Sequence, residues 1–264
     1  GVGLHAERIY LPLLGELQRA GDSAVVGVVE LASRGERVTR LLWAQELLTP
    51  ALKLTLLDDA RAHDEEYVLG VLRQLHAQAP FDAMLIACDP RQRDAYFTFG
   101  CQSRTAIFVD KPVFARDGLA HWEAAAIKYG AELLALEERV RAAGIDFVVQ
   151  AQRRDHVGYR FVSATLEQYR ARLGVPLTSI QIQHADGMWV LPGEWERDYH
   201  PYKFGFGKLL HSGYHFIDLL AVLLAALLAA CSNQPPVPDW QQNAHGAAER
   251  ASAAYLAGND RVAA

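Results

Sequence analysis

The sequence opens with the stretch that decides its fold, GVGLHAERIYLPLLGELQRAG (residues 1–21). It fits the pattern G-x-G-x-x-A, with small residues at Gly1, Gly3 and Ala6. Gly1 would permit a tight turn, Gly3 a close approach of the backbone to a pyrophosphate, and Ala6 close packing of the helix that follows. Apolar residues at helical spacing predict that this helix ends near Gly21. Because such a turn links a strand to a helix, we expect the first strand to be missing from the sequence.

An acidic residue follows at the end of the next expected strand. The run SAVVGVVEL (residues 23–31) is unbroken and β-branched, as in strands that are covered on both faces. Glu30 lies near its end, where a carboxylate can accept hydrogen bonds from an adenine ribose. This favours a dinucleotide site over an ordinary glycine turn. Glu30 would repel a 2′-phosphate, whereas Ser33 and Arg34 could accommodate one, so we expect NAD or NADP.

Further strands alternate with helices over the next hundred residues. The expected strands are FDAMLIACDP (81–90), TAIFVDKPV (105–113) and IDFVVQAQRR (145–154), with helical patterns over 58–78 and about 119–143. Alternation of this kind predicts βαβ units and a doubly wound parallel sheet. We therefore predict an α/β protein whose first domain, residues 1–152, is a Rossmann dinucleotide-binding domain.

The pattern changes after Arg154. The stretch YRFVSATLEQYRARLG (159–174) predicts a helix, and LTSIQIQHADGMWVL (177–191) predicts a long strand with one less buried face, because its polar residues alternate. We therefore expect a second domain over residues 153–264. Its last part, residues 233–264, shows little strand pattern and is assigned no element.

Composition excludes several classes of partner. The 264-residue chain carries a net charge of −5 with scattered Lys and Arg, which argues against a nucleic-acid partner. Three cysteines without a CxxC pair indicate a reducing compartment, so we expect the cytoplasm. The apolar stretch LLAVLLAALLAACSN (219–233) lies late in the chain and is shorter than the roughly 20 residues that span a bilayer, so we expect a buried core helix and no membrane partner.

A lysine follows the third buried strand, within VDKPV (109–113). The carboxyl edge of an open α/β sheet is where ligands bind, so Lys111 would be delivered into that crevice. Pro112 restricts the lysine to extended geometry, and a partly desolvated lysine can exchange protons near neutral pH. A surface lysine at a strand end would fit the spacing equally well.

Two histidines lie four residues apart in KLLHSGYHFIDLL (208–220). His211 and His215 would share one helix face, as metal ligands can. However, the zinc-protease pattern has a glutamate after its first histidine where this sequence has serine, and the central glycine suggests a helix start. Three further residues could complete a metal shell or equally line a polyol pocket: His184, Asp186 and His200. We expect no metal.

A segment rich in Gly, Pro and aromatic residues, PGEWERDYHPYKFGFG (192–207), is expected to be a loop. Its aromatic residues could pack between the domains, or they could grip a hydroxylated ligand by stacking and hydrogen bonding, together with Trp189, His200 and Tyr202. Arg153 and Arg154 lie at the expected hinge. One of them would form a structural ion pair and the other could bind an acidic substituent.

Four motifs together resemble those of the Gfo/Idh/MocA family of nicotinamide-dependent oxidoreductases. GVGLHA, a DKP after a buried strand, a strand ending in QRR, and GFGKLLHSGYHFIDLL occur in the family's order across most of residues 1–224. The resemblance implies a Rossmann domain followed by an α/β domain with an open, mostly antiparallel sheet, and a homodimer or homotetramer. The chain is shorter at both ends than the family expects, so the second sheet is expected to be incomplete.

The resemblance also implies roles for single residues. The family motif is Glu-Lys-Pro, in which Asp110 here replaces the glutamate, and Lys111 would hydrogen-bond the reacting hydroxyl. His215 matches the family's acid/base histidine, a task that suits an imidazole of unperturbed pKa about 6.5. His211 stands where the family has aspartate, so the proton relay or the substrate choice is expected to differ. The expected cofactor contacts are Gly1, Gly3, Leu4, His5, Ala6, Glu30, Ser33, Arg34, Cys88, Asp89, Pro90, Asp110 and Lys111.

The sequence therefore suggests an NAD(P)-dependent oxidoreductase acting on a hydroxyl or carbonyl carbon of a sugar, cyclitol or related polyol. His215 with Lys111 would remove the hydroxyl proton while hydride passes to the nicotinamide. The alternatives are a non-catalytic sensor that keeps the nicotinamide pocket and a subunit that only supports an assembly. Retention of both Lys111 and His215 argues against the sensor. The expected substrate contacts are Lys111, Arg153, His184, Asp186, Trp189, His200, Tyr202, His211 and His215.

Overall fold

The computed structural model describes residues 1–173, 179–183, 191–196 and 203–228. The chain forms two compact units: Gly1–Gln150 with Val190–His211, and Ala151–Trp189 with Ser212–Ala264. The predicted second domain includes the segment 190–211, whereas the structure groups this segment with the first unit. The predicted domain boundary after residue 152 stays a prediction.

The glycine turn leads into a helix, as predicted. A π-helical stretch, Ala6–Tyr10, continues into α1 (Leu11–Ala20). The helix ends at Gly21, whose φ of 78° lies in the left-handed region that glycine adopts without steric cost. The Gly21 N–H donates to carbonyls of the last helical turn, which satisfies groups that a helix end otherwise leaves unpaired. The predicted end of this helix is confirmed.

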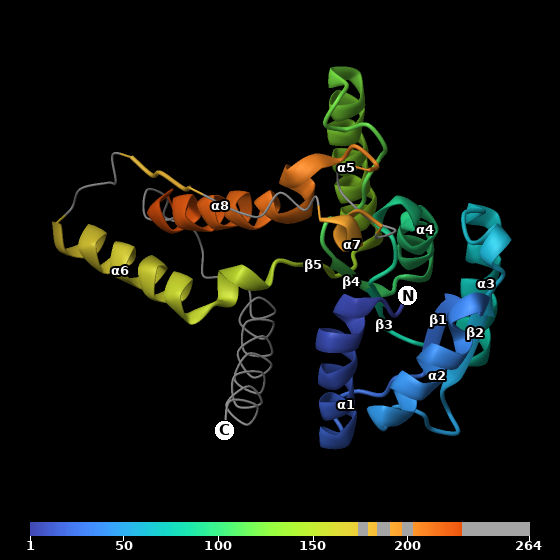
Figure 1. Ribbon diagram of the computed structural model, residues 1–264. Helices are drawn as coiled ribbons and strands as arrows, with labels where there is room; N and C mark the ends of the chain where they lie inside the picture. The colour runs from blue at the N-terminus through green and yellow to red at the C-terminus, as the bar shows by residue number, and fades with distance from the viewer. Residues whose placement is uncertain (174–178, 184–190, 197–202, 229–264) are drawn as a thin grey trace. The chain divides into compact units, whose positions relative to one another are not determined.

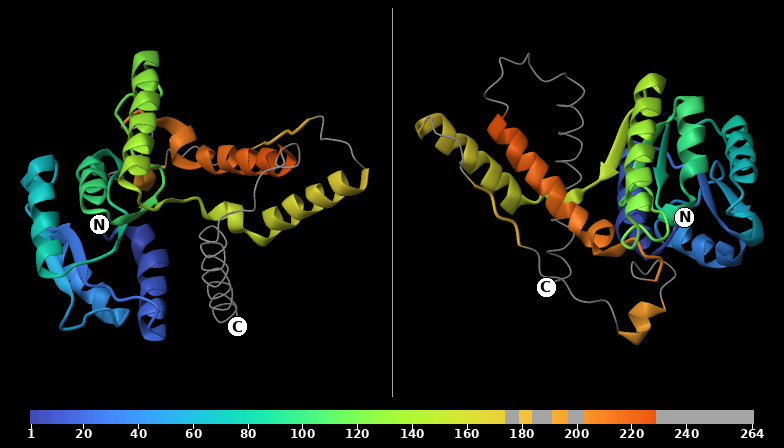
Figure 2. Two further views of the ribbon diagram at one scale, coloured as in Figure 1. Left: turned by 180° about the vertical axis from the view of Figure 1, so that it is seen from behind. Right: turned by 90° about the horizontal axis from the view of Figure 1, so that it is seen from above.

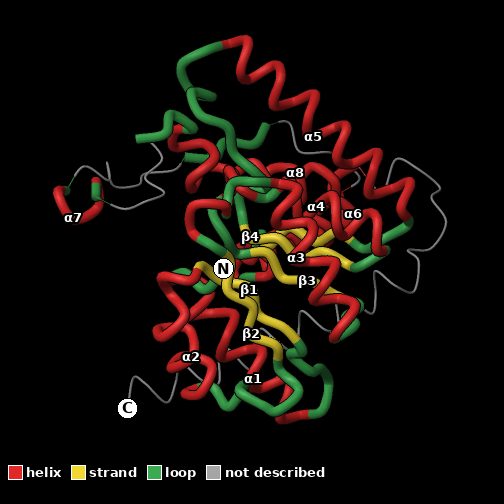
Figure 3. The backbone as a smooth tube through the Cα atoms, turned by 90° about the vertical axis from the view of Figure 1, so that its right-hand side faces the viewer, coloured by secondary structure: helices red, strands yellow, loops and turns green. Residues whose placement is uncertain are grey.

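Within the described residues, five short strands form two parallel sheets (Figure 3). In the first sheet β1 (Gly27–Leu31) pairs with β2 (Lys53–Leu57), and in the second β4 (Ala106–Asp110) lies between β3 (Ala83–Ile86) and β5 (Phe147–Gln150). All pairs are parallel, so the carboxyl ends of paired strands lie at the same edge of each sheet. The predicted α/β class with parallel strands is confirmed.

Helices cover both faces of the sheet formed by β1 and β2. The remaining helices of this half are α2 (Gly35–Ala44), α3 (Glu65–Gln78), α4 (Asp94–Ser103) and α5 (Glu123–Ala143). Val28 packs into a cluster with Val38 of α2, whereas its neighbour Val29 packs into a second cluster with Leu72 of α3. Because successive strand residues point to opposite faces, these two clusters lie on opposite sides of the sheet. This two-stranded sheet is therefore covered on both faces, whereas the predicted single doubly wound sheet is divided, among the described strands, into two parallel sheets.

The second sheet is packed through one face. Ile107 and Val109 of β4 are fully buried in a cluster with Phe97 of α4 and Leu136 of α5. Figure 2 shows α3, α4 and α5 following one another in a row beside the strands. Leu85 keeps 36% of its surface exposed, so the opposite face is less covered within the described residues.

Two strand assignments from the sequence were wrong or incomplete. Strand β2 was missed because its five residues, KLTLL, mix polar with apolar side chains at the edge of a two-stranded sheet. The alternation around Thr55 was the signal that could have found it. The strand predicted over 177–191 is not formed at the described residues 179–183, and residues 184–190 lie outside the described part. The open antiparallel sheet therefore stays a prediction.

The second unit contains two long helices that lie side by side, α6 (Val157–Leu173) and α8 (Tyr214–Leu228) (Figure 1). The short helix α7 (Pro192–Trp195) belongs to the first unit. Helix α8 confirms that residues 219–228 of the apolar stretch are helical, and residues 229–233 lie outside the described part. Leu219 is buried, whereas Leu224 is exposed, so the expected burial holds only for some of the described positions. No helix in the described residues has both the length and the apolar character needed to cross a membrane.

Candidate functional site

The glycine turn is held in place through both backbone groups of Val2. The Val2 N–H donates to a carboxylate oxygen of Glu30, and the Arg37 guanidinium donates to the Val2 carbonyl at 2.8 Å. Arg37 also forms an ion pair with Glu7. The turn is therefore fixed against the end of β1 and the first turns of two helices. Arg37 was missed from the sequence, because the G-x-G-x-x-A pattern contains no signal for it.

The glycines of the turn have different surroundings. A Cβ at Gly1 would lie 3.3 Å from Cα of Cys88, so the turn packs closely on the loop that follows β3. A Cβ at Gly3 would meet no atom within 4 Å, so the backbone there faces open space. Open space beside a glycine backbone and a helix start is what an approaching pyrophosphate requires.

Glu30 is almost fully buried at the end of β1. One carboxylate oxygen accepts the Val2 N–H, and the other accepts the Leu31 N–H at 2.9 Å. A carboxylate has about four lone-pair sites, so two backbone donors leave capacity for hydroxyl donors. The predicted contact with an adenine ribose is compatible with this geometry and stays a prediction.

The loop that follows β1 is tied to the loop that follows β2. The Ser33 N–H donates to one oxygen of Asp59 at 3.0 Å, and the Ser33 hydroxyl donates to the other. These hydrogen bonds to Ser33 lower the pKa of Asp59 below its usual value. Asp59 was missed from the sequence because β2, which delivers it, was missed.

Asp110 organises the start of the lysine loop at the end of β4. Its Oδ1 accepts the Tyr10 hydroxyl at 3.0 Å and the Lys111 backbone N–H at 2.9 Å. Burial, reinforced by the negative charge of Asp110, raises the pKa of the Tyr10 phenol. Tyr10 therefore stays protonated and donates to the carboxylate. Tyr10 was not among the predicted site residues, although it lies on the helix that the glycine turn begins.

His5 lies beside the same carboxylate. Its Nε2 is 3.9 Å from Asp110 Oδ1. Its ring meets the Tyr10 ring edge-on, with 5.2 Å between the two ring centres. Burial lowers the pKa of His5 from its usual 6.5, and the nearby Asp110 only partly opposes this shift. The imidazole is therefore mostly neutral at pH 7. The structure thus brings the predicted residues His5, Asp110 and the Lys111 backbone together.

A buried arginine connects the loops that follow β3 and β4. Arg93 is 2% exposed and lies just before α4. Its guanidinium donates to the Cys88 carbonyl at 2.7 and 3.1 Å and to three carbonyls of the lysine loop: those of Asp110, Pro112 and Val113. A guanidinium offers five donors in a rigid plane and stays charged, so it can serve several carbonyls at once. Arg93 was missed because nothing in its local sequence distinguishes it from a surface arginine.

The neighbouring loop residues have structural contacts of their own. Asp89 accepts the Arg91 backbone N–H at 2.9 Å and forms an ion pair with its guanidinium at 2.7 Å. The Arg91 guanidinium also lies 3.5 Å from the ring centre of Phe204. Pro90 is buried. The predicted cofactor contacts of this loop stay predictions.

Part of the aromatic segment packs on the loop that contains Gly118, within the first unit. The Phe204 carbonyl accepts the Gly118 N–H at 3.0 Å, and the Gly205 carbonyl accepts the Ala120 N–H at 2.7 Å. Gly205 has a φ of 69°, and a Cβ there would lie 3.0 Å from Cα of Gly118, so only glycine fits this approach without displacement. The candidate ligand contacts that lie outside the described residues are His184, Asp186, Trp189, His200 and Tyr202.

The second unit holds the candidate acid/base residue. His215 is buried, and its Nε2 lies 2.5 Å from the Tyr214 hydroxyl. His211 lies on the π-helical stretch Leu209–Gly213 that leads into α8. Lys111 belongs to the first unit and His215 to the second, so their predicted convergence in one cleft stays a prediction.

The two arginines at the start of the second unit differ in their contacts. Arg154 donates from Nε to Asp218 Oδ2 at 3.0 Å and from Nη2 to Asp218 Oδ1. Arg153 instead lies with its guanidinium 5.1 Å from the ring centre of Phe216. Arg154 is therefore the arginine of the structural ion pair. Within the described residues, no group of three or more His, Cys, Asp or Glu side chains could hold a metal ion.

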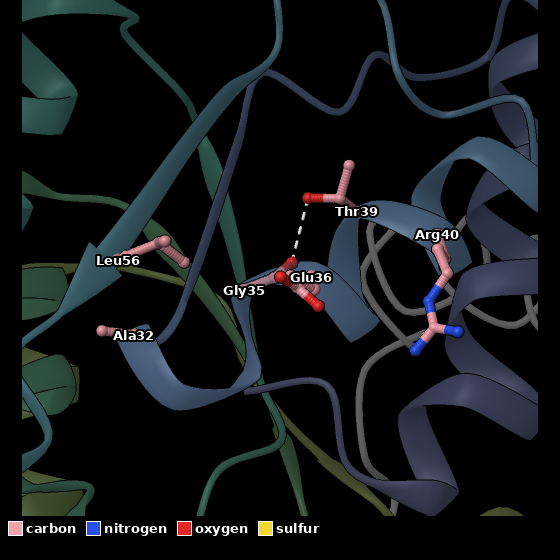
Figure 4. Close-up of a pocket in the computed structure, with 6 residues that line it drawn as sticks. All are labelled: Ala32, Gly35, Glu36, Thr39, Arg40 and Leu56. Atoms are coloured by element: carbon pink, nitrogen blue, oxygen red, sulfur yellow. Dashed lines mark hydrogen bonds between the residues drawn. The ribbon is translucent and has the colours of Figure 1, made fainter.

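A shallow surface depression lies next to the loop after β1 (Figure 4). Figure 4 shows the Thr39 hydroxyl donating to the Gly35 carbonyl, at 2.9 Å, in the first turn of α2. None of the predicted site residues lines this depression. The residues that line it are Ala32, Gly35, Glu36, Thr39, Arg40 and Leu56.

Comparisons with known proteins give a likeness of structure. Neither the protein-family models nor the curated proteins contain a match to this sequence. Two crystal structures of the WlbA (WbpB) dehydrogenase from Thermus thermophilus are similar to this chain. The structure in complex with NAD and UDP-GlcNAcA has a TM-score of 0.52 and 16% sequence identity. The structure in complex with NAD and alpha-ketoglutarate has a TM-score of 0.50 and 18% sequence identity. Each alignment covers 84% of this chain, which spans 60% and 59% of those chains. At these identities the likeness establishes a shared fold.

Proposed function

We propose that this chain is an NAD(P)-dependent oxidoreductase of the Gfo/Idh/MocA type, which transfers hydride between the nicotinamide and a hydroxyl or carbonyl carbon of a sugar, cyclitol or related polyol. One observation carries the proposal: the helix that the glycine turn begins is tied to the lysine loop at the carboxyl end of β4, because Asp110 accepts both the Tyr10 hydroxyl and the Lys111 N–H. That end of the strands is where open α/β folds bind ligands. The similar dehydrogenase structures, which contain NAD, support the same assignment.

The residues present fit a dinucleotide. The open space at Gly3 suits the pyrophosphate, and the Glu30 carboxylate retains acceptor capacity for ribose hydroxyls. When bound, the cofactor would supply the hydride chemistry. Cys88 packs against Gly1, so the loop after β3 would border the same ligand.

Lys111 would hydrogen-bond the reacting oxygen. The Asp110 carboxylate accepts the Lys111 N–H, and Arg93 binds the backbone carbonyls of Asp110 and Pro112 on either side of the lysine. The backbone from which the Lys111 side chain extends is therefore fixed. A group that must meet a substrate in one geometry gains rate from such positioning. His215 would move the proton of the substrate hydroxyl, with Tyr214 as hydrogen-bond partner of its Nε2.

We further propose a cytoplasmic homodimer or homotetramer, on the family resemblance and on the cysteine content of the sequence. The described cysteines, Cys88 and Cys101, are free thiols. A free thiol is the usual state of cysteine in a reducing compartment.

The decisive experiment measures binding and turnover separately. Reduction of NAD+ or NADP+ would be followed across a panel of polyols and sugars, and cofactor binding would be measured by titration calorimetry. We expect Lys111→Ala still to bind cofactor, while turnover falls by about 10²–10⁴-fold, the range for a positioned proton-transfer group. The matched control is Lys128→Ala, which removes an exposed lysine from α5.

Other outcomes would select the alternatives. Native turnover in Lys111→Ala would remove the lysine from the mechanism. Cofactor binding without turnover of any panel substrate would favour a non-catalytic sensor of the same fold. A chain that binds neither dinucleotide would favour a purely structural subunit.

A further inference from the structure

A serine and a carboxylate join the loops that follow β1 and β2. Ser33 has two hydrogen-bond donors, its N–H and its hydroxyl, and both are directed to the Asp59 carboxylate. The Asp59 carboxylate thus accepts hydrogen bonds from both donors of Ser33, which lies in the loop after β1.

The position of this pair follows from the parallel register. Glu30 lies opposite Leu56 and Leu31 opposite Leu57, so the loops after β1 and β2 leave the sheet side by side. Glu30 in turn contacts Val2 of the glycine turn. Ser33 follows Glu30 by three residues, so the Val2–Glu30 contact and the Ser33–Asp59 pair lie at the same edge of the two-stranded sheet.

We propose that Asp59 makes this site select NAD against NADP. The inference rests on the proposed function, in which Glu30 receives the adenine ribose and the groups beyond it face the ribose 2′ position. A 2′-phosphate needs N–H and O–H donors and positive charge. Here the two donors of Ser33 are already used, and two carboxylates, those of Glu30 and Asp59, would lie next to the phosphate.

The charge of Asp59 persists at the pH where binding would be measured. The hydrogen bonds from Ser33 lower the pKa of Asp59, so the carboxylate stays ionised around neutral pH. Arg34, the next residue after Ser33, brings one positive charge against the two negative charges of Glu30 and Asp59.

The test compares the binding of NADH and NADPH by fluorescence titration, for the native chain and for Asp59→Asn. Asparagine keeps an oxygen acceptor for Ser33 and removes the charge. We expect the native chain to bind NADH at least about tenfold more tightly than NADPH, equivalent to ~1.4 kcal/mol. In Asp59→Asn, NADPH binding should tighten by about tenfold, while NADH binding stays within about twofold.

Two variants separate charge from other effects. Glu36→Gln removes an exposed carboxylate from the depression beside the same loop, and the ratio of the two affinities should stay native. Ser33→Ala removes the hydroxyl but keeps the Asp59 charge, so NADPH binding should remain weak. Thermal unfolding of each variant checks that it is folded.

The failures of the two proposals are distinguishable. NADH binding with equal NADPH binding in the native chain would overturn the selectivity proposal and leave the proposed function intact. An Asp59→Asn variant that changes neither affinity, or both equally, would also overturn it. A native chain that binds neither dinucleotide would overturn the proposed function together with this inference.

Discussion

The first unit holds its polar groups differently from the second. At the strand ends of the first unit, buried side chains bind backbone groups and one another across 17 to 100 residues of sequence, as Arg93, Glu30 and Asp110 do. In the second unit, α6 and α8 lie side by side, and an ion pair joins Arg154, whose side chain is 49% exposed, to Asp218 of α8, whose side chain is 19% exposed.

This difference indicates which of the two candidate catalytic residues, Lys111 or His215, is held more firmly by the contacts around it. Buried polar groups with several hydrogen bonds have one arrangement that satisfies them, because leaving any of them unpaired is costly. An exposed ion pair gains little, because water competes for both partners. The hydrogen bonds of the first unit therefore fix the backbone of Lys111. The Arg154–Asp218 ion pair fixes the position of His215 on α8 less firmly.

The largest effect should come from Arg93→Met. Several buried carbonyls would lose their donor, and the free energy of unfolding should fall by at least about 3 kcal/mol, since each unsatisfied buried group costs roughly 1–3 kcal/mol. Urea denaturation of the full chain measures this. The control Arg73→Met, which removes an exposed arginine from α3, should lower stability by less than about 1 kcal/mol. Equal effects of the two substitutions would contradict the role of Arg93.

Tyr10→Phe should have the next largest effect. The substitution removes the donor to Asp110 and keeps the ring, so stability should fall by about 1.5–3 kcal/mol, the range for a hydrogen bond to a charged group. Turnover should fall as well, because Asp110 also binds the Lys111 backbone. Tyr169→Phe, at an exposed tyrosine of α6, is the control. An equal loss of stability in Tyr169→Phe would contradict the assignment of the Tyr10→Phe effect to the hydrogen bond with Asp110.

Asp218→Asn should have a smaller effect on stability. The pair with Arg154 is partly exposed, so its loss should cost no more than about 1 kcal/mol. A double-mutant cycle with Arg154→Gln measures the coupling energy between the two side chains. A coupling as large as the effect of Arg93→Met would remove the contrast between the two units.

His5 should produce the smallest effect, visible as a dependence on pH. Because burial lowers the pKa of His5 in the folded state, its contribution to stability is present above pH 6.5 and is lost as the pH falls through the folded-state pKa. His5→Gln should therefore flatten the decline in the free energy of unfolding below pH 6.5. The exposed His63→Gln is the control. An unchanged slope in His5→Gln would show that the ring is not desolvated in the folded state.

The sequence by itself determined the elements that local rules specify. The alternation of apolar runs with helical patterns gave the α/β class, and the helix end at Gly21 followed from the helical spacing of the apolar residues before that glycine. The positions of Glu30, Asp110 and Lys111 at strand ends also followed, because a strand and the residue after it are neighbours in sequence. Where the local signal was weak, as in β2, the prediction failed.

The tertiary structure alone decided which side chains meet. Arg93 reaches the lysine loop, Tyr10 reaches Asp110, and Asp59 reaches Ser33, although no spacing rule links these pairs. It also placed Phe204 and Gly205 against the first unit. The physical reason is that helix and strand periodicities are properties of short segments, whereas a contact between distant residues depends on how the whole chain packs its buried surface and satisfies its buried polar groups.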